Sequence, residues 1–156
     1  MRFVVIAVGA RQPGWVDAAF DDYAKRMPRE ARLELRCVKP ESRASGRSTT
    51  QMLAREAERV EAALPRDCEQ VVLDEHGERP DSTGFSRRIE RWLAGGRDVA
   101  FIIGGADGLA PRLKHSAHAL LALSAMTLPH GLARVLLAEQ LYRGLSILRN
   151  HPYHRG

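Results

Sequence analysis

Cysteine is scarce in this sequence, and long apolar runs are missing. The two cysteines, Cys37 and Cys68, stand alone, with no C-x-x-C pattern and no paired histidines at ligand spacing. This argues against a thiolate zinc site and a disulfide-stapled miniprotein, so we expect free thiols and no metal. No stretch approaches the roughly 18 apolar residues that a membrane helix needs. We therefore expect a cytoplasmic protein that contacts no membrane.

The N-terminal apolar run, residues 3–10, is β-branched and stops at Arg11. This pattern is typical of a first strand and not of a signal peptide. With 156 residues, of which 44% are hydrophobic and 28% charged, the chain has the size and composition of one globular domain. We predict a single domain over residues 1–156.

Acidic residues are outnumbered, and the formal net charge of +5 favours a polyanionic partner. Residues 40–48 are polar and basic, which predicts a mobile loop that either touches RNA or serves as a solvated connector. The C-terminal tail has no Asp or Glu and offers groups for stacking, proton transfer and phosphate binding. A frayed terminus is the alternative for this tail. Its basic and aromatic side chains are Arg149, His151, Tyr153, His154 and Arg155.

Short β-rich runs alternate with helical patterns along the chain. Strands are expected over residues 2–8, 32–38, 70–74, 99–103 and 123–128. Helices are expected over residues 15–27, 49–64, 85–93, 113–121 and 132–148. This alternation predicts an α/β fold with a mostly parallel sheet and helices on both faces.

A glycine-rich loop, Ile-Ile-Gly-Gly-Ala-Asp-Gly-Leu over residues 102–109, follows the fourth predicted strand. Ligands bind at the carboxyl ends of parallel strands, and Gly104 and Gly105 would let a ligand approach the backbone closely. A tight turn that needs glycine is the alternative. The loop matches neither G-x-G-x-x-G nor the Walker A pattern, which argues against an ordinary dinucleotide or P-loop site.

A second passage from a predicted strand to a loop covers residues 123–131 and ends in Pro-His-Gly before the last helix. A histidine at the carboxyl end of a strand is well placed for site chemistry. A structural role at the start of the helix is the alternative for this residue, His130.

The last predicted helix is apolar around most of its circumference, so it must be widely buried. Self-association through residues such as Leu141 and Leu145 would bury it, and a central place in the chain's own core is the alternative. One narrow polar strip remains on this helix, formed by Glu139, Arg143, Ser146 and Asn150.

Three ordered motifs, residues 103–108, 123–130 and 150–155, follow an early Gly-Trp with a nearby Phe and Tyr. In these motifs and in length the whole chain resembles the RlmH family of small SPOUT-class methyltransferases, which act on large-subunit ribosomal RNA. The resemblance implies an α/β-knot fold whose C-terminal segment threads through a preceding loop as a trefoil knot. It also implies the cofactor S-adenosylmethionine, a homodimer, and methylation at N3 of a pseudouridine in the assembled ribosome.

The resemblance places the cofactor at three strand ends. The residues it implies for cofactor binding are Leu73, Gly104, Gly105, Leu123, Ser124, Ala125, Met126, Thr127 and Leu128.

The methyl donor is itself the electrophile, so the tail would position the target base and help to remove its N3 proton. His154 is the first candidate for the base, and His130 is the second, with shaping of the cofactor loop as its alternative role. Tyr153 would stack on the target base or hold its edge. Arg155 and Arg143 would stabilise the charge that spreads onto the two carbonyls, or contact phosphate.

Two functions of other classes also fit the composition. A noncatalytic ribosome-binding module would need the basic tail and loop but no cofactor cavity. A doubly wound nucleotide-utilising enzyme would bind ATP or a dinucleotide instead of S-adenosylmethionine.

Overall fold

A computed structural model describes residues 1–9 and 11–155. Ala10 and Gly156, the last residues of the predicted first apolar run and of the tail, lie outside that description. The strands are β1 (Arg2–Val8), β2 (Arg32–Val38), β3 (Glu69–Glu78), β4 (Val99–Ile103) and β5 (Ala119–Leu121). The helices are α1 (Gly14–Arg26), α2 (Thr49–Ala63), α3 (Ser82–Gly95), α4 (Pro111–Ser116) and α5 (His130–Leu148), with a short 3₁₀ turn at Arg29–Ala31.

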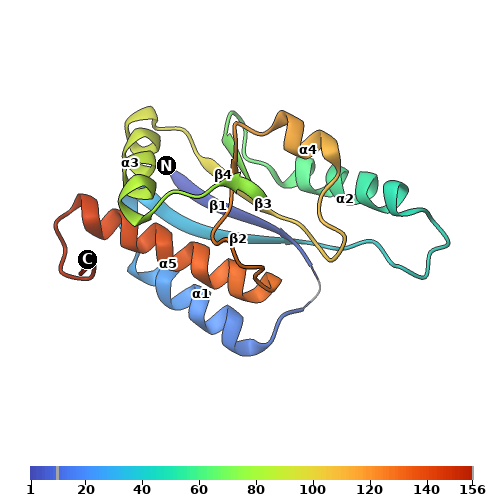
Figure 1. Ribbon diagram of the computed structural model, residues 1–156, viewed down its shortest axis with the longest axis horizontal. Helices are drawn as coiled ribbons and strands as arrows, with labels where there is room; N and C mark the ends of the chain where they lie inside the picture. Colours follow the sequence, from blue (N-terminus) through green and yellow to red (C-terminus); the bar gives the residue numbers. More distant parts are fainter. Residues whose placement is uncertain (10, 156) are drawn as a thin grey trace.

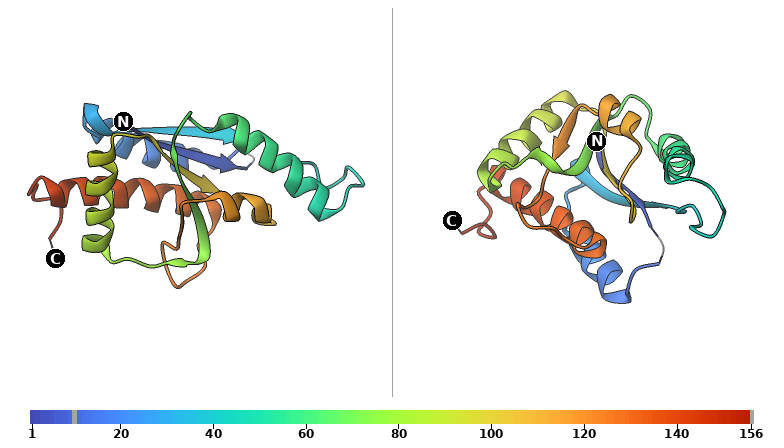
Figure 2. Two further views of the ribbon diagram at one scale, coloured as in Figure 1. Left: turned by 90° about the horizontal axis from the view of Figure 1, so that it is seen from above. Right: turned by 45° about the vertical axis from the view of Figure 1, so that its right-hand side comes forward.

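The five strands form one parallel sheet in the order β2-β1-β4-β3-β5. Helices α1, α3 and α5 cover one face, and α2 and α4 cover the other (Figures 1 and 2). Alternate residues of β1 serve the two faces: Phe3 packs in the first core and Val4 in the second. The predicted α/β fold with helices on both faces is therefore confirmed. Within the described residues, no helix is long and apolar enough to span a membrane.

Local signals explain where the middle helices begin and end. Ser48 and Gln51 form a capping box at the start of α2. The Asp81 side chain accepts a hydrogen bond from the Gly84 backbone N–H at the start of α3, and Gly96, with φ of 68°, ends that helix.

The fifth strand and the helix before it lie elsewhere than the sequence predicted. The predicted helix over residues 113–121 ends at Ser116, and the backbone of His118 already pairs with Gln70 of β3. The strand is Ala119–Leu121, and the predicted strand over residues 123–128 is an irregular segment. One cause is Ser124, whose hydroxyl accepts a hydrogen bond from the Met126 backbone N–H and so stabilises a turn.

The predicted role of the last helix in self-association through Leu141 and Leu145 is wrong. Leu141 is 0% exposed and Leu145 is also buried within the single chain. Both pack in the core between the sheet, α1 and α3. The alternative interpretation, a central core helix, is confirmed for this face of α5.

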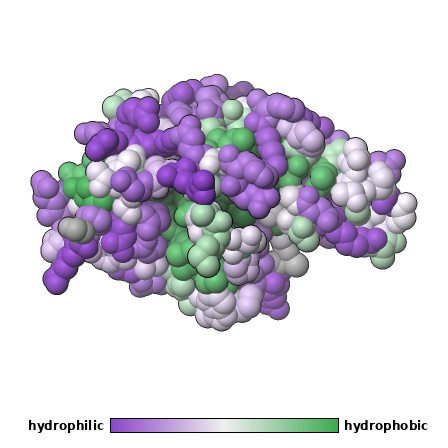
Figure 3. All heavy atoms as spheres, viewed as in Figure 1, coloured by the Kyte–Doolittle hydropathy of each residue, from purple (hydrophilic) through white to green (hydrophobic). Residues whose placement is uncertain are grey.

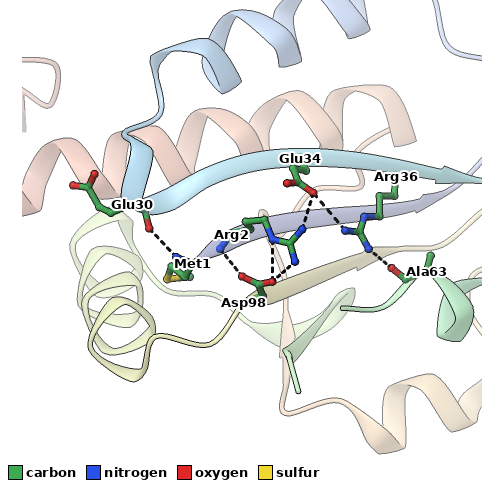
Figure 4. A network of polar contacts seen from close by, with 7 residues as sticks. All are labelled: Met1, Arg2, Glu30, Glu34, Arg36, Ala63 and Asp98. Atoms are coloured by element: carbon green, nitrogen blue, oxygen red, sulfur yellow. Dashed lines mark hydrogen bonds and ion pairs between the residues drawn. The ribbon is translucent and has the colours of Figure 1, made fainter. Parts of the chain in front are cut away.

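The edge of the sheet where β1 and β4 begin carries a network of charged side chains (Figure 4). The Asp98 carboxylate accepts hydrogen bonds from the Arg2 backbone N–H at 2.7 Å and from Arg2 Nη2 at 2.6 Å. Burial raises the pKa of Asp98, but the hydrogen bonds from Arg2 outweigh burial and hold this pKa below its usual value. The carboxylate form therefore stabilises the folded state.

We expect Asp98→Asn to lower the free energy of unfolding by about 1–3 kcal/mol at pH 7. Because the folded-state pKa is depressed, this stabilisation is complete above the unfolded pKa of ~3.9 and is lost as the pH falls through the folded value. Urea denaturation at pH 7 and pH 3 measures the difference, which should shrink at pH 3. Asp22→Asn, which removes an exposed ion pair to Arg26, is the control and should change stability little.

Candidate functional site

A cavity of about 350 Å³ opens beside the middle of β3, at the end of β4 and along the segment that runs from β5 to α5. The fold therefore brings together eight of the nine residues that the sequence predicted for cofactor binding. The ninth, Ala125, is exposed and does not line the cavity. The eight that line it are Leu73, Gly104, Gly105, Leu123, Ser124, Met126, Thr127 and Leu128.

Charged residues that the sequence analysis missed also line this cavity: Asp74, Glu75 and Lys114. Lys114 Nζ lies 2.6 Å from Asp74 Oδ2, and the His76 backbone N–H donates to Asp74 Oδ1. The hydrogen bond from Lys114 lowers the pKa of Asp74, so this carboxylate is ionised at neutral pH. The signal available in the sequence was the position of Asp74 at the end of the predicted strand over residues 70–74, although the observed strand continues to Glu78.

Leu73, Asp74 and Glu75 of β3 form one wall of the cavity, and the end of the strand then lies close to β5. The pairing of the two strands is irregular between Leu73 and Glu78. A Cβ at Gly77 would lie 2.6 Å from the backbone of Leu120 and Leu121, so only glycine allows this close approach.

The glycine loop forms another wall, and its glycines differ in role. A Cβ at Gly104 would lie 2.8 Å from the Gly108 backbone, so Gly104 permits the tight fold of the loop. Gly108 has φ of 80° and donates to the Gly105 carbonyl. Gly105 has ordinary backbone geometry and ordinary space around its Cβ position. The tight-turn interpretation therefore applies to Gly104 and Gly108, and the turn does not require a glycine at position 105.

His130 stands at the start of α5 and lines the cavity with both ring nitrogens engaged. Its Nδ1 lies 3.0 Å from the Gly104 carbonyl oxygen, and Arg134 Nε donates to its Nε2 at 2.8 Å. Burial and the charge of Arg134 lower the pKa of His130, so the ring is neutral at pH 7. This arrangement favours the loop-shaping role of His130 over the role of base.

The C-terminal tail folds back onto α5 and α1. Asn150 adopts a left-handed φ of 52°, and the His151 backbone N–H then bonds to the Ser146 carbonyl. The turn places the Tyr153 ring 4.8 Å from that of Tyr142. The tail is thus packed in the structure, contrary to the frayed alternative.

A cluster of aromatic and charged side chains surrounds Tyr153. The Tyr153 hydroxyl donates to Glu139 Oε1 at 3.1 Å and lies 3.3 Å from the Tyr23 hydroxyl. Burial and these neighbours raise the pKa of Tyr153, so the phenol stays protonated at neutral pH. The Arg26 guanidinium lies 4.6 Å from the centre of the Tyr23 ring. Of these partners, the sequence analysis had singled out Glu139 alone, as part of the polar strip.

The other predicted catalytic residues lie in or near this cluster. Arg143 Nε donates to Glu139 Oε1 at 2.8 Å, and Arg143 Nη1 lies 3.4 Å from His154 Nδ1. Arg155 is exposed. The structure therefore brings together Arg143, Tyr153 and His154, and places His130 elsewhere.

His130, which lines the cavity, is the first residue of α5, and the tail follows the opposite end of this helix (Figure 1). His130 and Arg143 are 13 positions apart on this helix, which is about 20 Å along its axis at ~1.5 Å per residue. Arg143 therefore cannot reach the cavity of its own chain.

Arginines of the basic loop over residues 40–48 form ion pairs within the protein. The buried Glu41 carboxylate pairs with Arg47 at 2.7 Å and with Arg59 at 2.6 Å. Arg43 pairs with Asp107 of the glycine loop at 2.8 Å. These contacts favour the connector interpretation over an RNA contact.

The family model described as "Predicted SPOUT methyltransferase" matches residues 1–154. The chain belongs to the SPOUT methyltransferase family. Among curated proteins, SPOUT relatives named "Ribosomal RNA large subunit methyltransferase H" occur in Bordetella pertussis strain Tohama I and Nitrosospira multiformis. They are 56% and 54% identical to this chain over 155 residues, which are 99% of each chain.

Solved structures confirm the SPOUT fold. A Bordetella pertussis Tohama I protein assigned as a methyltransferase matches with a TM-score of 0.58 and 20% identity, covering 92% of this chain and 96% of that one. A methylase family protein from Neisseria gonorrhoeae matches with a TM-score of 0.53 and 10% identity, covering 97% and 95%. At these identities the likeness concerns the fold alone. The trefoil knot stays a prediction.

Proposed function

We propose that this protein transfers a methyl group from S-adenosylmethionine to N3 of a pseudouridine in large-subunit ribosomal RNA, on the assembled ribosome in the cytoplasm. The observation that carries the proposal is the 54–56% identity to relatives named as large-subunit rRNA methyltransferases, along nearly the full length of both chains. The cavity lined by the glycine loop and the segment after β5 supports the proposal, because it would hold the methyl donor.

The chemistry of the cavity suits S-adenosylmethionine. The apolar side chains and backbone groups of residues 121–124 and 126–128 would hold the adenine and ribose. The carboxylates of Asp74 and Glu75 complement the positive ammonium and sulfonium groups, and Lys114 complements the carboxylate. The cofactor, when bound, supplies an electrophilic methyl group. The volume of about 350 Å³ lies within the usual range for such ligands.

The tail residues remain our candidates for handling the target base. Pseudouridine N3 is protonated at neutral pH and lies between two carbonyls, so a methyl acceptor forms only as the proton leaves. His154 beside Arg143 would accept that proton, and Arg143 or Arg155 would stabilise charge on the carbonyl oxygens. Tyr153, protonated and packed on Tyr142, would offer its ring or hydroxyl to the base.

These roles require a homodimer, because the tail and the cavity of one chain lie about 20 Å apart along α5. We propose that the tail of one subunit completes the cavity of its partner. The apolar surface over α5 at the centre of Figure 3 would contribute to the interface. Among the described residues, the large apolar side chains that are exposed are Trp15 (56%), Met126 (79%) and Leu132 (39%).

The methyl-transfer proposal is tested with the purified protein and isotopically labelled S-adenosylmethionine. Assembled ribosomes and free large subunits, both isolated from cells lacking the enzyme, are the substrates, and RNA mass spectrometry locates the label. We expect one labelled pseudouridine, with faster transfer to assembled ribosomes. Calorimetry that detects RNA binding but no heat with S-adenosylmethionine would instead support a noncatalytic ribosome-binding module.

The dimer proposal predicts that Trp15→Glu or Leu132→Glu makes the protein monomeric. The first turns of α1 and α5 adjoin, since a Cβ at Gly131 would lie 3.0 Å from Val16 Cγ2, so both substitutions place charge on one apolar surface. Sedimentation at micromolar concentration measures the change. Ala44→Glu, in the exposed loop before α2, is the control and should leave a dimer. An unmodified protein that sediments as a monomer would refute the proposal.

A further inference from the structure

Arg134 is an arginine on the apolar side of α5, and it is only 1% exposed. A buried guanidinium is costly unless its N–H groups find partners. The partner of its Nε is a neutral imidazole, His130 Nε2, at 2.8 Å. Its Nη2 has no hydrogen-bond partner in the described part of the chain. Burying a guanidinium costs more free energy than one hydrogen bond to a histidine returns, which indicates that Arg134 has a role beyond packing.

The bond to Arg134 decides where the proton of His130 lies. Arginine nitrogens donate and never accept, so Nε2 of the neutral ring must be the acceptor. The single ring proton is then on Nδ1, which donates to the Gly104 carbonyl at 3.0 Å. Arg134 thus selects one tautomer, and that tautomer connects α5 to the glycine loop.

Packing at the end of β1 keeps the two side chains in place. A Cβ at Gly9 would lie 3.3 Å from Arg134 Nη2 and 3.4 Å from His130 Cε1. A side chain at this position would therefore crowd the guanidinium and the imidazole, and glycine leaves room for both in the observed arrangement.

We propose that Arg134 is a positioning residue of the cofactor cavity, which holds His130 in the tautomer that fixes the Gly104 carbonyl. The inference rests on the proposed function, because it assigns Arg134 to the binding of S-adenosylmethionine. The Gly104 carbonyl belongs to the loop that lines the cavity, so a loop released from His130 binds its ligand less tightly. In this role both nitrogens of His130 are used, and none is left to act as a base.

The test compares Arg134→Met, which keeps the length but removes all donors, with Arg134→Lys, which keeps a donor and the charge. Nitrogen-15 chemical shifts of the His130 ring at pH 7.5 report the tautomer. Calorimetry with S-adenosylhomocysteine reports the affinity of the cavity. We expect one tautomer, protonated at Nδ1, in the unmodified protein and in the lysine variant. We expect a mixture of tautomers in the methionine variant, with a dissociation constant about tenfold higher.

Two substitutions of His130 keep the proposal testable if Arg134→Met does not fold. The amide nitrogen of asparagine can donate where Nδ1 does, so His130→Asn should bind S-adenosylhomocysteine within about threefold of the unmodified protein. His130→Ala lacks the donor and should bind about tenfold less tightly. At one subsaturating concentration of S-adenosylmethionine, His130→Asn should transfer methyl groups faster than His130→Ala, whereas a catalytic base at this position would make both variants inactive.

Three results would overturn the inference: an Nε2-protonated ring in the unmodified protein, unchanged affinity in a folded methionine variant, or loss of transfer without loss of binding in His130→Asn. Failure of the unmodified protein to bind either S-adenosylmethionine or S-adenosylhomocysteine would contradict the proposed function. The tautomer would then still decide whether Arg134 orients His130.

Discussion

A chain that ends at Asn150 is expected to bind S-adenosylmethionine normally and to lose methyl transfer to the ribosome. The cavity lies at the first turn of α5, and the removed residues lie beyond its last turn. The removed part carries Tyr153, His154 and Arg155, which we assign to the target base, so the expected loss of rate is at least about 100-fold. Calorimetry and a ribosome methylation assay measure the two properties separately.

The truncated chain should still fold. Its main loss within the subunit is the packing of Tyr153 on Tyr142 and the hydrogen bond to Glu139, which together contribute about 1–2 kcal/mol. Tyr153→Phe is the matched control for stability, because it keeps the packing of the ring on Tyr142 and loses only the hydrogen bond to Glu139. Near-normal transfer by the truncated protein would show that the tail residues are not needed for the reaction.

Mixing subunits tests whether the tail serves the partner's cavity. A truncated subunit has an intact cavity, and a Gly105→Val subunit has an intact tail, so a hybrid dimer has one complete site. At a concentration of S-adenosylmethionine that saturates only the intact cavity, each variant alone should be nearly inactive, and random exchange at equal amounts should restore about a quarter of the full rate. A mixture that stays inactive, despite hybrids seen by native mass spectrometry, would show that each tail serves its own chain.

The regular part of the fold could be predicted because its pattern is local. The short strand-like runs predicted β1, β2 and β4 with the observed bounds, and the end of α2 was predicted to within one residue. The fifth strand could not be found in this way. Residues 119–121 form a strand because they pair with β3, and the more strand-like residues 123–128 leave the sheet to line the cavity.

The sequence predicted which residues line the cavity better than it predicted where the candidate catalytic residues lie relative to that cavity. The resemblance pointed to the segments that line the cavity, and the structure brings eight of those nine residues together. Distance along α5 separates His130 from the tail residues, and the helix predicted over residues 132–148 already lay between them, although the sequence analysis assigned both to one reaction. Arg134 was missed although it follows His130 at i+4 spacing on an apolar helix, where a charged residue indicates a specific partner.

Substitution of Gly105 in the glycine loop is expected to weaken the binding of S-adenosylmethionine strongly. Gly105→Val should raise the dissociation constant for S-adenosylmethionine by about 10- to 100-fold while the protein stays folded. Gly105 lines the cavity, and a Cβ there would meet Val8 Cγ1 at 3.4 Å, an ordinary contact. The first carbon therefore fits, and we expect the two methyl groups beyond it to reduce the space for the ligand.

Two neighbouring variants separate a blocked cavity from a damaged loop. Gly105→Ala adds only the carbon that fits, so its affinity should stay within about threefold of the unmodified protein. Gly104→Ala places a Cβ 2.8 Å from the Gly108 backbone, so it should distort the loop and lower the melting temperature as well as the affinity. Calorimetry and thermal melting of the three variants give the comparison. Unchanged affinity in folded Gly105→Val would mean that the ligand lies away from the glycine loop, against the residues that follow β5.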